Sequence, residues 1–170
     1  DLEGRPVANA TVRILELHQA DLDKLIKLLN KVDRYFSYPK SIEAEALNTP
    51  AHVTTGADGR FQLHGFGRER LVHLEISGET IERVRFFVMT RAEGAAGLKN
   101  GEPAYYQATF DHIAGPTKPI IGTVRAKGTG KPLAGITVRG VYWINKATTD
   151  IHGRYRIVGI AKQREYDILA

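Results

Sequence analysis

The sequence predicts an all-β fold in which one antiparallel β-sandwich occurs twice, with a helix inserted into the first copy. Three observations lead to this fold class. Apolar and polar residues alternate in several short runs, Gly, Pro and Asp-Gly turn signals separate these runs, and two sequence signatures each appear twice. Alternation indicates strands with one buried face, and short strands between frequent turns are typical of antiparallel sandwiches.

The composition supports a folded globular chain. Of the 170 residues, 42% are hydrophobic and 25% are charged, and none is Cys. A disordered chain would contain fewer apolar residues, and no apolar run approaches the roughly 20 residues of a membrane-spanning helix. The lack of Cys excludes disulfides, thiolate metal sites and cysteine nucleophiles within this sequence.

An internal repeat organises the chain. Residues 4–13 read again as residues 130–139, at an offset of 126 positions, and residues 54–65 read again as residues 148–159, at an offset of 94. The first copy therefore holds 32 more residues between its two signatures than the second copy does. Two copies of one module are the direct interpretation of this pattern.

Each element follows from the local sequence. In both copies a Gly-Arg-Pro or Gly-Lys-Pro turn leads into an alternating run, which predicts a turn followed by a strand. The Asp-Gly pair at residues 58–59 and the His-Gly pair at residues 152–153 predict hairpin tips, each followed by another strand. Further strands are predicted over residues 72–76, 84–88, 105–110 and 120–124.

The additional residues of the first copy predict a helix. Apolar residues recur there at helical spacing, and Asp21 precedes them as an N-cap. These apolar residues are Leu22, Leu25, Ile26, Leu29 and Val32. We expect one amphipathic helix over residues 21–32, inserted between strands and packed on the sandwich.

The repeat also predicts the domain boundaries. We expect a first domain over residues 1–114, with its insertion at about residues 17–50, and a second domain over residues 118–170. The first copy has no equivalent of the strand at residues 120–124, and the second has no equivalent of residues 84–88. We therefore expect the first copy to lack its first strand, the second to lack its last, and the sequence to be part of a longer chain.

The two signatures resemble the carboxypeptidase regulatory-like domain. Residues 122–159 contain almost the complete pattern, and residues 4–65 contain it around the insertion, with Gly56 in place of the usual Asp. The resemblance implies transthyretin-like Greek-key sandwiches, which usually act as noncatalytic modules beside metallocarboxypeptidases, in surface proteins and in outer-membrane receptors. The tandem arrangement resembles large envelope-associated proteins of planctomycete-type bacteria, which implies a secreted, cell-surface or periplasmic location.

The catalytic patterns of related enzymes are not met. A zinc carboxypeptidase requires a His-x-x-Glu pair, whereas His18, His52 and His73 are followed three positions later by Asp, Thr and Ile. The C-terminal Tyr-Arg-Gly-Ser of transthyretin-like hydrolases and the paired Tyr and His ligands of related dioxygenases are also missing. We expect no enzymatic activity and no cofactor in this segment.

Four other residues are candidate metal ligands. His64 and His73 are placed by the strand pattern on outward faces of neighbouring strands, but no third ligand is evident beside them. Asp58 and Asp150 lie in predicted hairpin turns, where an acidic side chain usually serves the turn itself. We expect no metal site at either pair.

Positive charge is concentrated in the second copy. Residues 118–170 contain 10 Lys or Arg and 3 Asp or Glu, whereas the other 117 residues have a net charge of −2. A candidate ligand platform combines charge and stacking. Its residues are Tyr142, Trp143, Arg154 and Arg156. The alternative is that the aromatic rings belong to the core and the arginines alternate with core residues on a surface strand.

Three functions fit these observations. The first is a noncatalytic structural or interaction module, a spacer or adhesion unit joined to other domains of a larger extracytoplasmic bacterial protein. The second is a domain that binds cell-envelope glycan or an anionic polymer. The third is a subunit of a β-strand-complemented assembly or filament, because an unpaired sheet edge accepts a strand from a neighbouring subunit. An accessory role beside an enzyme domain elsewhere in the chain also fits.

Overall fold

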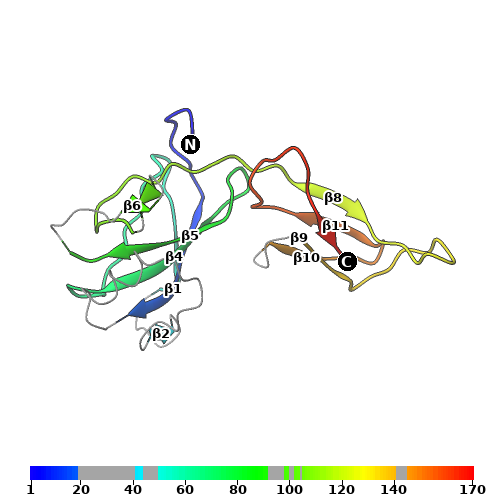
Figure 1. Cartoon of the computed structure of the whole chain (residues 1–170), viewed down its shortest axis with the longest axis horizontal. Coiled ribbons are helices and arrows are strands. Elements are labelled where there is room, and N and C mark those ends of the chain that lie inside the picture. The colour runs from blue at the N-terminus through cyan, green and yellow to red at the C-terminus, as the bar shows by residue number, and fades with distance from the viewer. Residues whose placement is uncertain (19–40, 44–49, 92–97, 100–101, 104, 141–144) are drawn as a thin grey trace. The chain divides into compact units, whose positions relative to one another are not determined.

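The computed structural model describes residues 1–18, 41–43, 50–91, 98–99, 102–103, 105–140 and 145–170. Within these residues the fold is all-β and the sheets are antiparallel, which confirms the predicted class (Figure 1). The described part contains no helix of the length and apolarity needed to cross a membrane. The helix expected over residues 21–32 lies outside the described residues.

The chain divides into two compact units. The N-terminal unit comprises residues 6–76 and 84–112, and the C-terminal unit comprises residues 1–5, 77–83 and 113–170. Each unit is described by itself below.

One antiparallel sheet with five strands forms the N-terminal unit. Its strands are β1 (Thr11–His18), β2 (Ser41–Glu43), β3 (His52–Thr54), β4 (Leu71–Ser77) and β5 (Val84–Met89). The strand order is β2-β1-β4-β5, and β3 pairs with β1 as well. A short ribbon is formed by β6 (Leu98–Lys99) and β7 (Glu102–Pro103).

Strands β4 and β5 form where the alternation predicts them. Val72 lies opposite Val88 and Ile76 lies opposite Val84, so branched side chains meet across the pair. The buried apolar residues of this unit are Ala10, Val12, Ile14, Leu17, Leu71, Val72, Leu74, Ile76, Val88, Met89 and Tyr105. Each large side chain buried in this way contributes about 1.5–3 kcal/mol.

The prediction of a strand over residues 105–110 is wrong. Only one bridge forms there, between Val88 and Tyr106. The rings of Tyr106 and Phe110 instead stack on each other, with their centroids 4.6 Å apart. Residues four apart in a strand are separated by roughly 13 Å, so this stacking requires the segment to bend back on itself.

Two small sheets form the C-terminal unit. One has the order β10 (Lys146–Thr148), β9 (Thr137–Gly140), β12 (Ile168–Leu169), and the other pairs β8 (Ile120–Thr123) with β11 (Arg154–Ile157). Both sheets contribute to one core, because Val138 of β9 and Ile157 of β11 are 0% and 1% exposed and belong to the same cluster. Partly buried side chains surround it: Ile120, Val124, Ala147, Tyr155, Tyr166 and Ile168.

The connection between β4 and β5 packs within the C-terminal unit. Ile81 is 2% exposed and forms a bridge with Pro116. The Arg83 amide donates to the Gly159 carbonyl at 2.7 Å, and the Thr117 hydroxyl donates to the Ile160 carbonyl. Residues 114–119, which Gly and Pro identify as a connection, are therefore held by hydrogen bonds to this unit.

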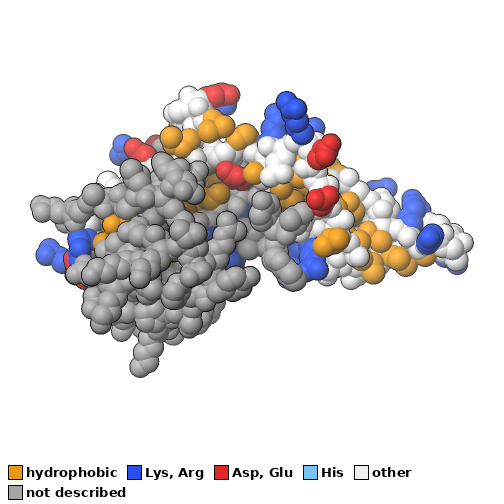
Figure 2. All heavy atoms as spheres, in the orientation of Figure 1, with side chains coloured by type: hydrophobic (Ala, Val, Ile, Leu, Met, Phe, Trp, Pro, Cys, Tyr) orange, Lys and Arg blue, Asp and Glu red, His pale blue; other side chains and the backbone are white. Residues whose placement is uncertain are grey.

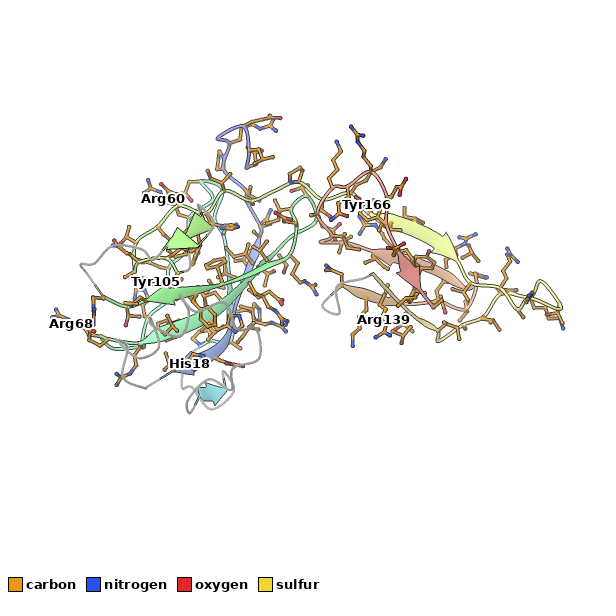
Figure 3. All side chains as sticks on the ribbon, in the orientation of Figure 1. His18, Arg60, Arg68, Tyr105, Arg139 and Tyr166 are labelled. Atoms are coloured by element: carbon orange, nitrogen blue, oxygen red, sulfur yellow. The ribbon has the colours of Figure 1, made fainter. Side chains whose placement is uncertain are left out.

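Tyr166 closes the C-terminal end of this core. Its hydroxyl accepts a hydrogen bond from the Gln163 amide at 2.8 Å and donates one to the Ala161 carbonyl at 3.2 Å (Figure 3). These two bonds tie the Tyr166 hydroxyl to the backbone of the segment that precedes it.

The repeated signatures form the same strand pairing in both units. β1 pairs with β3 through Thr11–Thr54, Val12–Val53 and Arg13–His52. β9 pairs with β10 through Thr137–Thr148, Val138–Ala147 and Arg139–Lys146. Each pair of the second set is reached from the first by the sequence offsets of 126 and 94 positions.

One buried threonine anchors each signature. The Thr55 hydroxyl donates to the Val7 carbonyl at 2.7 Å and accepts from the Ala10 amide at 2.9 Å. The Thr149 hydroxyl makes the equivalent bonds at the same two distances, to the Leu133 carbonyl and from the Ile136 amide. The two sequence signatures therefore fold into one hydrogen-bonded arrangement, which we call the threonine frame.

The tip of each frame requires glycine. Gly59 and Gly153 have φ of 73° and 71°, in the left-handed region that favours glycine. At Gly153 a Cβ atom would lie 2.6 Å from the Val124 carbonyl oxygen, which leaves no room for a side chain. The turn at each predicted tip thus depends on the Gly of the Asp-Gly and His-Gly pairs. The strand expected after residues 58–59 does not form, and β10 and β11, on either side of the second turn, lie in different sheets, so neither turn closes a two-stranded hairpin.

Candidate functional site

The structure describes two of the four residues of the predicted ligand platform. Arg154 and Arg156 lie two residues apart on β11, opposite Thr123 and Ile121 of β8, and all four side chains are exposed. Tyr142 and Trp143 lie outside the described residues. The combination of rings and cations therefore stays a prediction.

Arg156 is partly neutralised. Its guanidinium lies 2.9 Å from a Glu79 carboxylate oxygen, and both side chains are largely exposed. A surface pair of this kind contributes only about 0–1 kcal/mol, so it tethers Arg156 weakly. Arg154 forms no ion pair with the described residues.

A second group of exposed side chains surrounds the hairpin tip of the second frame. The Val124 amide donates to the Gly153 carbonyl at 2.8 Å, and the Leu133 amide donates to the Val124 carbonyl at 3.0 Å. These bonds hold residues 126–133 beside the turn at residues 150–153. We call this end of the C-terminal unit the basic tip.

The basic tip carries apolar and cationic side chains together. Ile151 is 81% exposed and Leu133 is 36% exposed. Arg125, Lys127, Lys131, His152 and Arg154 are exposed around them. Figure 2 shows Lys and Arg side chains beside hydrophobic ones at this end of the unit, on the right of the view.

One carboxylate lies at the tip, and the turn uses it. Asp150 Oδ1 accepts hydrogen bonds from the Arg154 amide at 2.8 Å and the His152 amide at 2.9 Å. These bonds, that from Arg154 first, hold the pKa of the Asp150 carboxyl below its usual range. Asp150 therefore stabilises the turn and leaves Lys127 and Lys131 without an acidic partner among the described residues.

In the first frame Asp58 performs the same local role. Gly56 occupies the position of Asp150, and a Cβ atom there would lie 3.1 Å from Asp58 Oδ1. The same oxygen accepts from the Arg60 amide at 3.0 Å. The acceptor is thus supplied from two residues further along the turn, which explains how the first copy forms its tip without the usual Asp.

An aromatic cluster in the N-terminal unit escaped the sequence analysis. Phe86 stacks on His112 with centroids 5.0 Å apart and contacts the edges of the Tyr106 and Phe110 rings. Phe61 joins the cluster through Phe110. The five residues come from three parts of the sequence, at residues 61, 86 and 106–112, so no single local pattern connects them all.

His112 is partly buried within this cluster. Its Nδ1 lies 3.1 Å from the Tyr106 hydroxyl, while its Nε2 is buried without a hydrogen-bond partner. Burial lowers the pKa of the His112 imidazole. No carboxylate of the described residues is bonded to the His112 ring, and its contacts there are the stacked Phe86 and the Tyr106 hydroxyl.

Charged residues and histidines form a second cluster on β1, β4 and β5. His73 stacks on Phe87 with centroids 4.5 Å apart, and Arg85 Nε lies 2.9 Å from Glu75 Oε2. His18 is 0% exposed, and its Nε2 lies 3.3 Å from a Glu16 carboxylate oxygen (Figure 3 labels His18). Burial lowers the pKa of the His73 imidazole.

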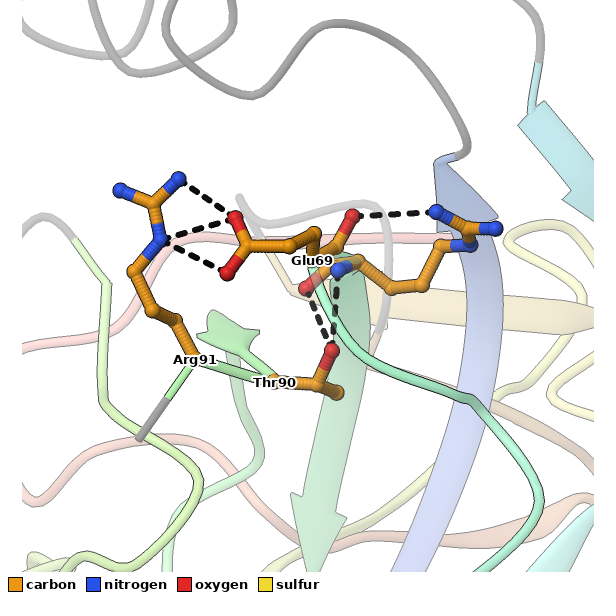
Figure 4. A network of polar contacts seen from close by, with 4 residues as sticks. Glu69, Thr90 and Arg91 are labelled. Carbon is orange, nitrogen blue, oxygen red and sulfur yellow. Dashed lines mark hydrogen bonds and ion pairs between the residues drawn. The ribbon is translucent and has the colours of Figure 1, made fainter. Parts of the chain in front are cut away.

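A polar network joins the start of β4 to the end of β5 (Figure 4). Glu69 has a φ of 56°, which is uncommon for a residue other than glycine. Its carboxylate accepts from Arg91 Nε at 2.8 Å, and this bond lowers the pKa of the Glu69 carboxyl. The Arg70 amide donates to the Thr90 hydroxyl at 2.9 Å. The polar groups of this network therefore bond to one another.

The candidate metal ligands do not form a site. Among the residues that the structure describes, no three His, Asp or Glu side chains are placed to hold one ion. His64 belongs to no strand, contrary to the outward strand position expected for it.

Comparison with known proteins identifies no relative: no family model matches the chain, and neither does any curated protein or solved structure. The basic tip, with its exposed cationic and apolar side chains, is therefore the candidate site within the described residues.

Proposed function

We propose that the chain is a noncatalytic structural and interaction module. In this proposal, tandem transthyretin-like sandwiches act as a spacer or adhesion unit of a larger extracytoplasmic bacterial protein. The family and the location rest on the sequence resemblance.

The recurrence of the threonine frame carries the proposal. The two frames share their strand register and their threonine hydrogen bonds, although they lie in different units and differ at 11 of the 22 aligned positions of the signatures. A module whose frame is kept while its surface changes works through its shape and its surface. A catalytic module, by contrast, would require its few reacting groups to be held in one defined place.

The clusters inside the N-terminal unit fit the same function. The aromatic rings stack on one another, Glu75 pairs with Arg85, and Glu69 pairs with Arg91. Groups that satisfy one another in this way stabilise a fold and are poorly placed to bind substrate.

Mechanical unfolding tests this function. The chain has no Cys, so a cysteine added at each end provides unique attachment points for single-molecule pulling. A tandem spacer predicts two separate unfolding events. Extension without a force barrier would contradict a spacer, and one event for the whole chain would contradict two modules.

Two matched variants assign the events. Thr55→Val and Thr149→Val each remove one buried hydroxyl that bonds two backbone groups, at a cost of about 1–3 kcal/mol. Each variant should lower the force of one event and leave the other unchanged. A variant that lowers both events equally would argue against independent frames.

A further inference from the structure

The two frames provide an internal comparison at their tips. By the offsets of the repeat, Ile151 corresponds to Ala57, His152 to Asp58 and Arg154 to Arg60. In the loop before the frame, Lys127 corresponds to Asp1, Thr129 to Glu3 and Lys131 to Arg5. Because the frame is the same, these differences are not needed to build the turn.

The charges at the two tips differ in sign and in pairing. In the first copy Arg5 pairs with Asp1 at 3.2 Å, and Arg60 lies 3.8 Å from Asp58. In the basic tip no described residue forms an ion pair with Lys127, Lys131 or Arg154. The first copy thus pairs its cations, whereas the second leaves Lys127 and Lys131 without an acidic partner among the described residues; the Arg154 charge is partly offset by the Asp150 carboxylate.

Exposed apolar residues occur in both copies but are more numerous in the second. Of the large hydrophobic side chains exposed in the described part, Leu2 and Ile113 lie in the first copy, whereas Ile121, Leu133, Ile151 and Leu169 lie in the second. Ile151 is the most exposed of them, at 81%, and it stands at the turn where the first copy has Ala57. Single exposed apolar residues are common on protein surfaces, so what distinguishes Ile151 is its place beside Leu133 and among the cations of the basic tip.

We propose that the basic tip binds the surface of an anionic lipid bilayer. Lys127, Lys131 and Arg154 contact the headgroups, and Ile151 enters the boundary between headgroups and acyl chains, with Leu133 beside it. This inference names a partner for the interaction role proposed above and in that respect rests on it.

The side-chain chemistry favours a bilayer over a soluble polyanion. A polyanion is bound by cations and by rings that stack on it, and an exposed aliphatic side chain adds nothing to either contact. Both kinds of side chain strengthen binding to a bilayer, because each cation near an anionic surface and each buried CH₂ contributes to the binding free energy. The combination of a projecting isoleucine with surrounding cations matches the second case.

Vesicle binding by the intact chain tests the proposal. Cosedimentation is measured with phosphatidylcholine vesicles, with and without phosphatidylglycerol. Binding should require phosphatidylglycerol and weaken as salt rises. Lys127→Ser combined with Lys131→Ser should weaken it on the order of twentyfold, and Ile151→Ala by about tenfold.

The first copy supplies matched controls. Arg5→Ser and Arg60→Ser remove one cation each from corresponding positions and should leave vesicle binding unchanged. Ile151→Ala introduces the residue that the first frame carries at this position, so it should melt at the temperature of the parent chain. The melting temperature of every variant is measured beside its binding.

Three results would overturn the proposal. They are no binding to anionic vesicles, equal binding to vesicles without phosphatidylglycerol, and binding to soluble polyphosphate that is as tight as to vesicles and insensitive to Ile151→Ala. The last result would identify a polyanion surface instead. None of them alters the pulling experiment, so failure of the lipid site and failure of the module function are distinguishable.

Discussion

At the residue scale, single polar groups decide the shape of the turns. Asp150 and Asp58 occupy different positions of their hairpins, yet each accepts the backbone amide of the arginine that follows the turn. A sequence pattern that requires Asp at the position of Asp150 does not detect that Asp58, two positions later in the turn, supplies the carboxylate in the first copy. The carboxylate is required by the turn, and the position that supplies it can move by two residues.

Asp150 should make stability depend on pH. Its pKa is lowered in the folded chain, so its contribution is present above the unfolded value of about 3.9 and is lost as the pH falls through the folded pKa. Asp150→Asn should therefore be less stable than the parent chain at neutral pH. Denaturant midpoints measured from neutral to acidic pH should converge, and a difference that stays constant with pH would contradict this role.

Gly122 and Tyr155 should act as a pair. They lie opposite each other on β8 and β11, and a Cβ atom at Gly122 would lie 2.4 Å from the Tyr155 hydroxyl. Gly122→Ala forces the ring to move and should cost about 1–3 kcal/mol. In a Tyr155→Ala background the same change should cost much less. Urea unfolding of the four chains measures the coupling, and additive costs would show that the ring does not cover this glycine.

At the element scale, the connection between β4 and β5 belongs to a different compact unit from the strands that it joins. Residues 77–83 pack in the C-terminal unit, whereas most of β4 and all of β5 lie in the N-terminal unit. Hydrophobic alternation predicts both strands correctly. It gives no information on the connection, because its partners at Pro116 and Gly159 are distant in the sequence.

Ile81 should therefore stabilise strands far from it in sequence. Ile81→Ala removes a side chain that is 2% exposed and should cost about 2–4 kcal/mol. Hydrogen exchange should accelerate in β8 and β11. As a control, Glu79→Ala in the same connection removes only an exposed ion pair and should have little effect. Unchanged exchange in β8 and β11 after Ile81→Ala would place this residue outside their core.

At the scale of the whole molecule, the class of fold was predictable from the sequence, but the packing of distant segments against one another was not. The all-β class, β4 and β5 are confirmed, because alternation and turn chemistry are local properties. The prediction of a strand at residues 105–110 was wrong, because the Tyr106 and Phe110 rings of this segment both pack against Phe86 of β5. The inserted helix and the tandem sandwiches stay predictions.

The candidate site was predictable only in part. Composition locates the excess positive charge in residues 118–170, and alternation places Arg154 and Arg156 on one face of a strand. The grouping of Ile151 and Leu133 with Lys127 and Lys131 required the hydrogen bonds that bring residues 126–133 to the turn at residues 150–153. The signal that was available is the isoleucine at the position where the first copy has Ala57, between the Thr-Thr and Gly-Arg pairs that both copies share.

The sequence by itself determined the β-class, the repeated signatures and the unequal distribution of charge, since each depends on neighbouring residues or on composition alone. Only the tertiary structure decided that one threonine anchors each frame, which core holds the connection after β4, and which cations remain unpaired. Those features depend on contacts between distant residues, and the free energy of such contacts is set by burial and geometry that no local pattern records.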